Sequence, residues 1–258
     1  MIEVHNLTFG YSSTEDGQIL KGVDFVAKTG KLTALIGTNG AGKSTLLKTI
    51  MGILKGKGDI TINGKSVAEY STKDFSSTVS YLSQDNDCRV NLTVFEVVML
   101  GRMGSMSFRV SDEDIAATQE VLERLNLQRF ASRSIMELSG GQRQLVFMAQ
   151  ALVKEPKILI LDEPTSALDL HKQFDLLTLL KNLTQENDFT TLVTLHHLDL
   201  AAMFADEIIV LKEGRVYAQG APKDIFTEAM MEDVYRVKTK IYMDDKGMPH
   251  VIPLEAIY

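Results

Sequence analysis

One short stretch combines glycines, a lysine and hydroxyl groups in a spacing that suits phosphate chemistry. The stretch GTNGAGKST begins at Gly37 and follows the apolar run KLTALI. Its glycines allow tight backbone turns that bring successive N–H groups toward phosphate oxygens, and the helix that follows adds its positive end. The pattern predicts a phosphate-binding loop, hereafter the phosphate loop, made of Gly37, Thr38, Asn39, Gly40, Ala41, Gly42, Lys43, Ser44 and Thr45.

The side chains at the end of this loop suit a magnesium-bound nucleotide. Lys43 is spaced to reach the β- and γ-phosphates, Ser44 offers a hydroxyl to Mg²⁺, and Thr45 offers a phosphate contact. The alternative is a glycine-rich turn between a strand and a helix in which a lysine occurs by chance. The full spacing, in a strand-to-helix context, favours the phosphate loop.

A second group of candidate residues, Asp162 and Glu163, follows directly after the apolar run KILIL. In an open α/β sheet the carboxyl ends of the strands line the ligand crevice. We therefore expect Asp162 to bind Mg²⁺ directly or through water, and Glu163 to act as the general base that orients and polarises the attacking water. Taken alone, an acidic strand end is commonplace and is often just a helix N-cap.

The segment ELSGGQRQ, which begins at Glu137, places two glycines where a helix must start. Ser139 and Gln142 have the spacing of a capping box, so a helix start is one complete interpretation. However, Gly140 and Gly141 each cost about 0.5–1 kcal/mol relative to alanine inside a helix. Glycines there are explained if an anion approaches the backbone closely, as helix N-termini favour.

The elements that position these residues follow from the apolar periodicity. Strand-like patterns cover 2–11, 19–28, 31–37 and 58–67, so the first third is predicted to be rich in β-structure. The middle of the chain has a helical period, with Thr93 and Glu96 in capping-box spacing and Ser111 before an acidic first turn. This region is predicted to be a helical insertion.

The last third alternates between strands and helices. Apolar runs at 157–162 and 190–197 predict buried parallel strands, and the stretch 171–186 between them predicts a crossover helix. A hairpin is expected at 206–220, and one helix at 222–237.

Composition limits the class of protein. The 258 residues are 45% hydrophobic and 24% charged, with a net charge of −7, which argues against binding to nucleic acid. Cys88, the single cysteine, cannot form an internal disulfide or a cysteine-based metal site, and is expected to be a small, partly buried residue in a reducing compartment. The chain has neither a signal-peptide pattern nor an apolar run of roughly 18 residues, so it is expected to reach a membrane only through a partner.

The order of motifs, from GTNGAGKST through YLSQD, LSGGQ, ILILDEP and SALD to TLHH, resembles the ATP-binding cassette (ABC) family along essentially the whole chain. The resemblance implies a mixed α/β fold: a P-loop NTPase core, an antiparallel β subdomain and an inserted α-helical subdomain. It further implies a single ATPase domain over 1–258, with the core at 1–86 and 152–258 and the helical insertion at 87–151.

The resemblance also assigns roles by position. Tyr11 would stack on adenine, Gln84 would sense Mg²⁺ and the attacking water, and His196 would contact the γ-phosphate. Asp169 would communicate between two sites, and the signature segment would close over the γ-phosphate held by Lys43 of a second subunit. That segment is Leu138, Ser139, Gly140, Gly141 and Gln142.

Each role has a plainer alternative. Tyr11 is otherwise a β-surface aromatic, Gln84 a loop amide, Asp169 a helix cap and His196 a histidine at a strand end. Two positions depart from the family pattern. His197 stands where Asp is frequent, and Ser83 replaces a proline before the loop glutamine, which leaves that loop more freedom.

The implied protein is an ATPase that forms a homodimer around two Mg·ATP and transmits its motion to membrane permease subunits. The short helices of the permease would sit in a groove near the Gln84 loop. The chain would lie peripherally at the cytoplasmic face of the cell membrane, in a system that includes an extracytoplasmic substrate-binding protein.

Several segments resemble ATPases of importers for ferric siderophores, haem and cobalamin. The alternatives are a cassette for another substrate, a non-transport cassette ATPase and a P-loop kinase. The kinase is disfavoured because LSGGQ would have no purpose in it.

Overall fold

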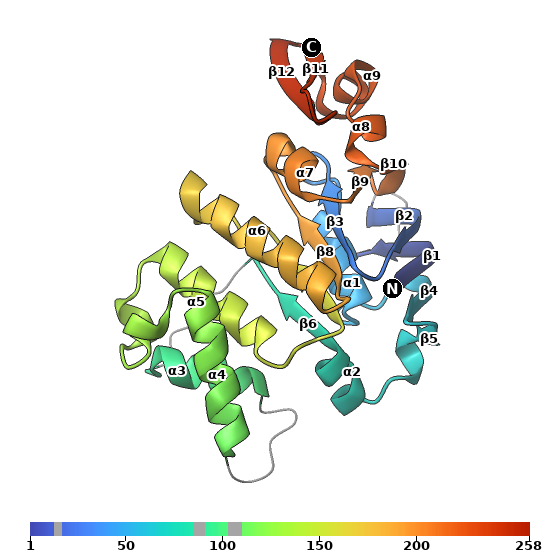
Figure 1. The fold of residues 1–258 in the computed structure, drawn as a ribbon. Helices are drawn as coiled ribbons and strands as arrows, with labels where there is room; N and C mark the ends of the chain where they lie inside the picture. Colours follow the sequence, from blue (N-terminus) through green and yellow to red (C-terminus); the bar gives the residue numbers. More distant parts are fainter. Residues whose placement is uncertain (13–16, 85–90, 103–109) are drawn as a thin grey trace. The chain divides into compact units, whose positions relative to one another are not determined.

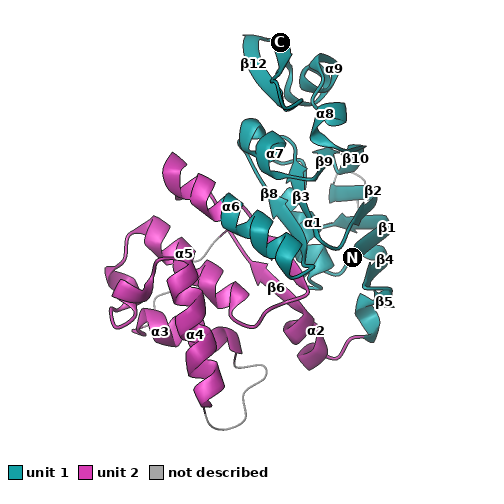
Figure 2. Ribbon diagram, viewed as in Figure 1, with its two compact units in different colours: residues 1–69, 177–258 teal, residues 70–176 magenta. Residues whose placement is uncertain are grey.

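The computed structural model describes residues 1–12, 17–84, 91–102 and 110–258. Cys88 and the predicted boundary at residue 87 lie outside these ranges. The chain divides into two units, one made of residues 1–69 and 177–258 and the other of residues 70–176 (Figure 2). The predicted helical insertion at 87–151 falls inside the second unit, and its exact boundaries stay a prediction. No helix in the described ranges is long and apolar enough to cross a membrane.

The first unit contains an antiparallel sheet with the strand order β2-β1-β4-β5 (Figure 1). Alternating apolar residues build it, since Ile2 and Val4 of β1 are fully buried while His5 is exposed. This sheet confirms the prediction of β-structure in the first third. Its strands are β1 (Ile2–Gly10), β2 (Gln18–Ala27), β4 (Lys57–Ile62) and β5 (Lys65–Ser66), followed by the 3₁₀ turn η2 (Val67–Glu69).

Parallel strands of the first unit position the phosphate loop, which begins directly after β3. β3 (Lys31–Ile36) pairs in parallel with both β8 (Thr190–Thr194) and β9 (Glu207–Lys212). These strands are almost entirely buried, as expected for parallel strands that read as continuous apolar runs. The predicted hairpin is confirmed, because β10 (Arg215–Gly220) pairs antiparallel with β9. The helices of this layer are α1 (Lys43–Ile50) and α7 (Leu198–Phe204).

The single helix predicted at 222–237 is wrong. Phe226 adopts an extended conformation and buries its side chain, and the Thr227 hydroxyl then accepts a hydrogen bond from the Met230 N–H, which restarts the helix. The segment ends in a left-handed residue, Arg236, with φ 55°. The observed elements are α8 (Pro222–Ile225), α9 (Glu228–Met230), the π-helix η6 (Met231–Tyr235) and an unforeseen hairpin, β11 (Val237–Met243) and β12 (Pro249–Ala256).

The second unit is mainly helical, as predicted. Capping boxes start three of its helices, at Thr93, Ser111 and Ser139. Its apolar core includes Val97 of α3 and Val146 of α5, both at most 1% exposed. The helices are α2 (Thr72–Thr78), α3 (Val94–Met99), α4 (Asp112–Arg124) and α5 (Gly140–Leu152), with the 3₁₀ turns η3 (Leu100–Arg102), η4 (Gln128–Phe130) and η5 (Ile135–Glu137).

Two parallel strands position the acidic residues in this unit. β6 (Val79–Leu82) pairs with β7 (Ile158–Leu161) so that Leu82 lies opposite Leu161. Because the two carboxyl ends are in register, the residues after each strand share one edge. The predicted crossover helix is α6 (Leu170–Glu186), and the division between the two units falls within it.

Candidate functional site

The phosphate loop in the first unit has the backbone that its glycines predict. Gly42 is the N-cap of α1 in the left-handed region, with φ 103°, and offers no side-chain acceptor to the N–H groups of the first turn. Gly37 has φ 147°, and a Cβ there would lie 2.2 Å from the Leu211 carbonyl oxygen. The Ala41 carbonyl accepts a hydrogen bond of 3.1 Å from the Gly214 N–H. The loop is thus fixed by its neighbours, and within the loop the Ala41 N–H donates to the Thr38 carbonyl at 3.2 Å.

Lys43 places its charge on the inside of this loop. Its Nζ donates to the carbonyl oxygens of Gly37 (2.8 Å) and Thr38 (3.0 Å), and the residue is only 7% exposed. At the rim of the loop no described atom lies within 4 Å of a Cβ built at Gly40. A buried ammonium group beneath uncapped N–H groups suits the terminal phosphates of a nucleotide.

His196 reaches the same sheet edge as the phosphate loop. It follows Leu195, whose N–H donates to the Leu35 carbonyl of β3 at 3.4 Å, and its side chain is exposed. Tyr11 lies elsewhere in this unit, just after β1. It is 70% exposed and packs edge-on against Phe9 with 5.0 Å between ring centroids. An open aromatic face of this kind can stack on a base.

The second unit brings Gln84 and Glu163 together. The Gln84 Nε2 donates to the Glu163 Oε2 at 2.8 Å, and the N–H of the neighbouring Asp162 donates to the Leu82 carbonyl at 2.8 Å. Asp162 is 1% exposed, whereas Glu163 is half-buried and Gln84 is exposed. The predicted metal ligand and the predicted general base therefore occupy adjacent positions with different access to solvent.

The backbone at Glu163 adopts an unusual conformation that α5 helps to hold. Glu163 has φ 51°, in the left-handed region that non-glycine residues avoid. Its carbonyl accepts hydrogen bonds of 3.0 Å from the Gln144 Nε2 and from the Ser166 hydroxyl. The Gln144 Oε1 in turn accepts from the Ala167 N–H at 3.3 Å. Sequence reasoning missed Gln144, although a glutamine on the buried face of an amphipathic helix was a signal that it has a polar partner.

The signature segment starts α5 as its spacing predicts. The Ser139 hydroxyl accepts from the Gln142 N–H at 3.4 Å, and the Gln142 Oε1 accepts from the Ser139 N–H at 2.9 Å. Leu138 is buried and Ser139 is exposed.

The two glycines of the signature segment differ in the space around them. Apart from the adjacent residues and the backbone of α5 itself, no described atom lies within 4 Å of a Cβ at Gly140, whereas a Cβ at Gly141 would lie 2.9 Å from the Ala167 carbonyl oxygen. Close packing therefore accounts for the second glycine, whereas the prediction explained both glycines by the close approach of an anion.

Asp169 caps the start of α6. Its Oδ1 accepts from the Lys172 N–H at 3.0 Å, and its Oδ2 pairs with the Lys172 Nζ at 2.9 Å. The hydrogen bonds from Lys172 lower the pKa of the Asp169 carboxyl. The cap interpretation is thus confirmed, and the role of Asp169 in communication between sites stays a prediction.

A cavity of about 800 Å³ lies in the second unit beside the Gln84 loop. Apolar surface comes from Leu100, Ala117 and Phe147, and Ser83 lines the cavity next to Gln84. Lys154 forms part of the wall. Its Nζ donates to the carbonyl oxygens of Ser76 and Val79, and burial lowers its pKa. This cavity lies where a groove was predicted, near the Gln84 loop.

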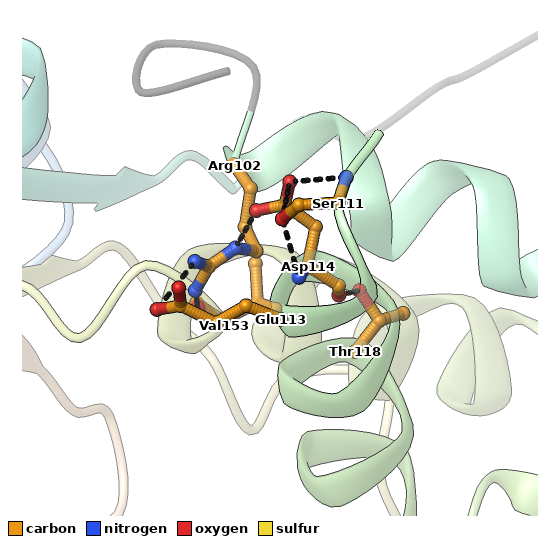
Figure 3. A network of polar contacts seen from close by, with 6 residues as sticks. All are labelled: Arg102, Ser111, Glu113, Asp114, Thr118 and Val153. Carbon is orange, nitrogen blue, oxygen red and sulfur yellow. Dashed lines mark hydrogen bonds and ion pairs between the residues drawn. The ribbon is translucent and has the colours of Figure 1, made fainter. Parts of the chain in front are cut away.

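A polar network joins η3 to the first turn of α4 at this cavity (Figure 3). The Arg102 Nε donates to the Asp114 Oδ1 at 2.5 Å, and its Nη1 donates to the Val153 carbonyl at 3.2 Å. Hydrogen bonds from Ser111 and then from Arg102 lower the pKa of Asp114 to about 2. Because the folded pKa is depressed, this carboxylate stabilises the unit above its ordinary pKa of 3.8, and the contribution is lost as the pH falls toward 2.

The donor set fits magnesium. Each predicted ligand is an oxygen donor of the kind that a hard cation prefers: a hydroxyl at Ser44, an amide at Gln84 and a carboxylate at Asp162. In the described ranges no group of three or more histidine, cysteine, aspartate or glutamate residues could hold a metal by itself. Magnesium held mainly by nucleotide phosphates usually has only one or two carboxylate ligands from the protein, and Asp162 is the predicted one.

Comparison with known sequences agrees with the motif order. A protein-family profile described as "ABC transporter" matches residues 20–166. An uncharacterized ABC transporter ATP-binding protein of Methanocaldococcus jannaschii is 38% identical over 98% of this chain and 98% of its own length. The iron(3+)-hydroxamate import ATP-binding protein FhuC of Bacillus subtilis is 37% identical over 95% of this chain and 91% of its own length.

Solved structures have the same fold. A metal-chelate type ABC transporter in an inward-facing conformation has a TM-score of 0.83 at 28% identity, covering 98% of this chain and 97% of the other. A dimeric post-hydrolysis state of an ATP-binding cassette bound to ADP and Pi has a TM-score of 0.78 at 30% identity, covering 86% and 98%. These likenesses confirm the predicted fold class: a mixed α/β fold with antiparallel sheets and a helical subdomain.

Proposed function

We propose that this chain, which belongs to the ABC transporter family and is an ATPase of that family, powers an importer for an iron-siderophore or a related metal chelate. The observation that carries the proposed chemistry is the contact between Gln84 and Glu163 at the shared edge of β6 and β7. A carboxylate held at an accessible strand end by an amide is suited to orienting a water molecule for attack on phosphate. The phosphate loop supplies the complementary groups that bind the nucleotide.

Each predicted residue has a role in this proposal. The loop N–H groups and Lys43 bind the phosphates, and Tyr11 stacks on adenine. Glu163 polarises the attacking water, and His196 contacts the γ-phosphate. Ser44, Asp162 and Gln84 would hold Mg²⁺, which supplies charge neutralisation on the phosphate oxygens when bound.

The signature segment acts in a second copy of the chain. Gly140 leaves open space at the start of α5, where N–H groups and the exposed Ser139 hydroxyl suit an anion. The similar cassette bound to ADP and Pi is dimeric, which supports a homodimer. In this arrangement Ser139 of one subunit closes over the γ-phosphate held by Lys43 of the other, and Asp169 communicates between the two sites.

The cavity beside the Gln84 loop is the docking site for a membrane permease. Its apolar wall, formed by Leu100, Ala117 and Phe147, suits a short amphipathic helix. The same loop then carries both the cavity residue Ser83 and the site residue Gln84, so docking and hydrolysis are linked through adjacent positions. The full system includes an extracytoplasmic substrate-binding protein, and the chain lies at the cytoplasmic face of the membrane.

Replacing Glu163 tests the proposed chemistry. Glu163→Gln keeps the shape of the side chain and removes the base, so ATP hydrolysis should fall by about 100- to 10,000-fold while ATP binding persists. Steady-state phosphate release and equilibrium binding of ATP measure the two effects, and size-exclusion chromatography should detect a trapped dimer. Lys43→Ala is the matched control and should lose binding itself. Near-normal turnover in Glu163→Gln would remove Glu163 from the base role.

A charged residue in the cavity tests the permease proposal. Ala117→Arg on the cavity-facing side of α4 should abolish co-purification with the permease and leave hydrolysis by the isolated chain unchanged. Gln119→Arg on the exposed side of the same helix is the control and should co-purify normally. Equal co-purification of both variants would contradict docking in this cavity.

The cargo is tested in cells that lack this chain. Loss of labelled ferric-siderophore uptake, restored by the wild-type chain and not by Glu163→Gln, supports the iron-chelate proposal. Normal ferric-siderophore uptake with loss of cobalamin uptake would move the cargo to another chelate.

A further inference from the structure

Gln144 is a buried glutamine on the helix that the signature segment starts. It is 7% exposed and lies five positions after Ser139, the N-cap of α5. Both ends of its amide are engaged. The Nε2 donates to the Glu163 carbonyl at 3.0 Å, and the Oε1 accepts from the Ala167 N–H at 3.3 Å. One side chain of α5 thus holds the loop after β7 at two points.

This pair of contacts requires the chemistry of an amide. A carboxylate has no donor for the Glu163 carbonyl, an ammonium group has no acceptor for the Ala167 N–H, and an apolar side chain has neither. Removing the amide would therefore take a partner from two backbone groups of the loop at once. Partly buried backbone groups that lose a partner favour a rearranged loop.

The contact at Glu163 supports an unusual backbone conformation. Glu163 has φ 51°, and its carbonyl also accepts from the Ser166 N–H at 3.3 Å and from the Ser166 hydroxyl at 3.0 Å, so it begins a tight turn. The backbone angles at Glu163 set the direction in which its side chain leaves the chain. In the observed direction the carboxylate contacts the Gln84 Nε2 at 2.8 Å. Gln144 therefore acts on the carboxylate through the backbone.

The start of α5 packs against the same loop. A Cβ at Gly141 would lie 2.9 Å from the Ala167 carbonyl oxygen, so a glycine lets the first turn of the helix approach the loop closely. Three residues later, Gln144 accepts from the N–H of the same alanine. The first two turns of α5 are thus fixed to the loop that carries Glu163, while Ser139 at the N-cap is exposed. A displacement of the N-cap is passed to the loop through contacts that are already formed.

We propose that Gln144 is a positioning residue through which the signature segment controls the orientation of Glu163 in its own subunit. This inference rests on the proposed homodimer and on the proposed base role of Glu163. In that dimer Ser139 faces the nucleotide bound by the other subunit, whereas Glu163 acts on the nucleotide bound by its own phosphate loop. Hydrolysis at one site then responds to nucleotide at the other through α5 and Gln144, by a route separate from Asp169.

Replacing the amide by an apolar side chain of similar length tests the orientation of Glu163. In Gln144→Met, kcat for ATP hydrolysis should fall about 10- to 100-fold, because hydrogen bonds that orient the base are lost, while the KM for ATP stays within about twofold.

Gln173→Met is the matched control. Gln173 is also buried, and its Nε2 donates to the Thr165 and Leu168 carbonyls of the same loop at 3.1 and 2.9 Å. This variant should lower the thermal midpoint of unfolding as much as Gln144→Met does, and should lower kcat by less than about threefold.

A double variant tests the route from Ser139. If part of the effect of Ser139→Ala passes through Gln144, the losses of kcat in Ser139→Ala and Gln144→Met should combine to less than their product. In the Gln173→Met background Ser139→Ala should keep its full effect. A purely structural role of Gln144 would give multiplicative losses in both backgrounds and would contradict the inference.

The outcomes separate this inference from the proposed function. Near-normal turnover in Glu163→Gln would remove the base role, and the proposed function would fail whatever Gln144→Met does. If Glu163→Gln is inactive and Gln144→Met keeps the wild-type kcat, the proposed function stands and this inference is overturned. Equal losses of kcat in Gln144→Met and Gln173→Met would indicate a general effect of the loop and would also overturn it.

Gln144→Glu keeps the inference testable if Gln144→Met does not fold. It retains an acceptor for the Ala167 N–H and removes only the donor to the Glu163 carbonyl. It should still lose about tenfold or more in kcat. A wild-type kcat in Gln144→Glu would overturn the inference.

Discussion

The phosphate loop and the signature segment both start a helix with glycines, yet they treat the first turn of that helix differently. α1 has a glycine N-cap in the left-handed region and therefore no side-chain acceptor at that position. α5 has a complete capping box, in which the Ser139 hydroxyl accepts from the Gln142 N–H and the Gln142 Oε1 accepts from the Ser139 N–H. The first helix start is open to a phosphate, and the second is closed by its own side chains.

This difference indicates how each segment can bind an anion. The phosphate loop needs no internal rearrangement, because Lys43 is already held by the loop carbonyls. In the signature segment the Ser139 hydroxyl is engaged at 3.4 Å, a long hydrogen bond that a better acceptor can replace. We infer that the phosphate loop binds nucleotide by itself, whereas the signature segment is a weak anion site that acts only when a second subunit presents the phosphate.

The largest effect is expected at the first glycine of the phosphate loop. Gly37→Ala forces a Cβ toward the Leu211 carbonyl at φ 147°, so the loop must shift and hydrolysis should fall by about 100-fold. Phosphate release and nucleotide binding measure this loss. Gly30→Ala, also at positive φ but with 3.4 Å to its nearest atom, is the control and should keep its nucleotide affinity. Wild-type binding by Gly37→Ala would show that the loop is not preformed.

An intermediate effect is expected for the two serine caps of the second unit. Ser139→Ala and Ser111→Ala each remove one side of a capping box and should each lower the free energy of unfolding by about 1 kcal/mol. Only Ser139→Ala should also reduce hydrolysis, by about 10- to 100-fold, because it loses a hydrogen bond to a charged phosphate. Denaturant unfolding and phosphate release separate the two effects. If both variants hydrolyse ATP equally well, Ser139 is a cap and nothing more.

The smallest effect is expected for the two glycines of the signature segment. Gly140→Ala has open space and should raise the free energy of unfolding by about 0.5–1 kcal/mol, while hydrolysis falls a few-fold because the added methyl group occupies the path of the anion. Gly141→Ala meets the Ala167 carbonyl oxygen at 2.9 Å and should lower stability instead. Urea titrations give the sign of each change. A stabilised and fully active Gly140→Ala would break the contrast with the phosphate loop.

Local patterns in the sequence were sufficient for much of this architecture. The capping boxes at Thr93 and Ser139 depend on residues three positions apart and formed as predicted, and the helix start expected at Ser111 has a capping box as well. The buried parallel strands were also predicted, because a continuous apolar run can be recognised in the sequence without knowledge of the strand that it pairs with. The helix predicted over 222–237 failed because burial of the Phe226 side chain, a tertiary contact, outweighed a continuous helical period.

What the sequence by itself determined was the set of chemically competent residues and the elements that carry them. It predicted roles for Lys43, Asp162 and Glu163, because phosphate and metal chemistry restrict residue type and spacing within a few positions. The tertiary structure alone decided which distant groups restrain them. Gln144 holds the Glu163 turn, and Leu211 excludes a side chain at Gly37. Such contacts depend on packing between residues far apart in sequence, and no local spacing encodes them.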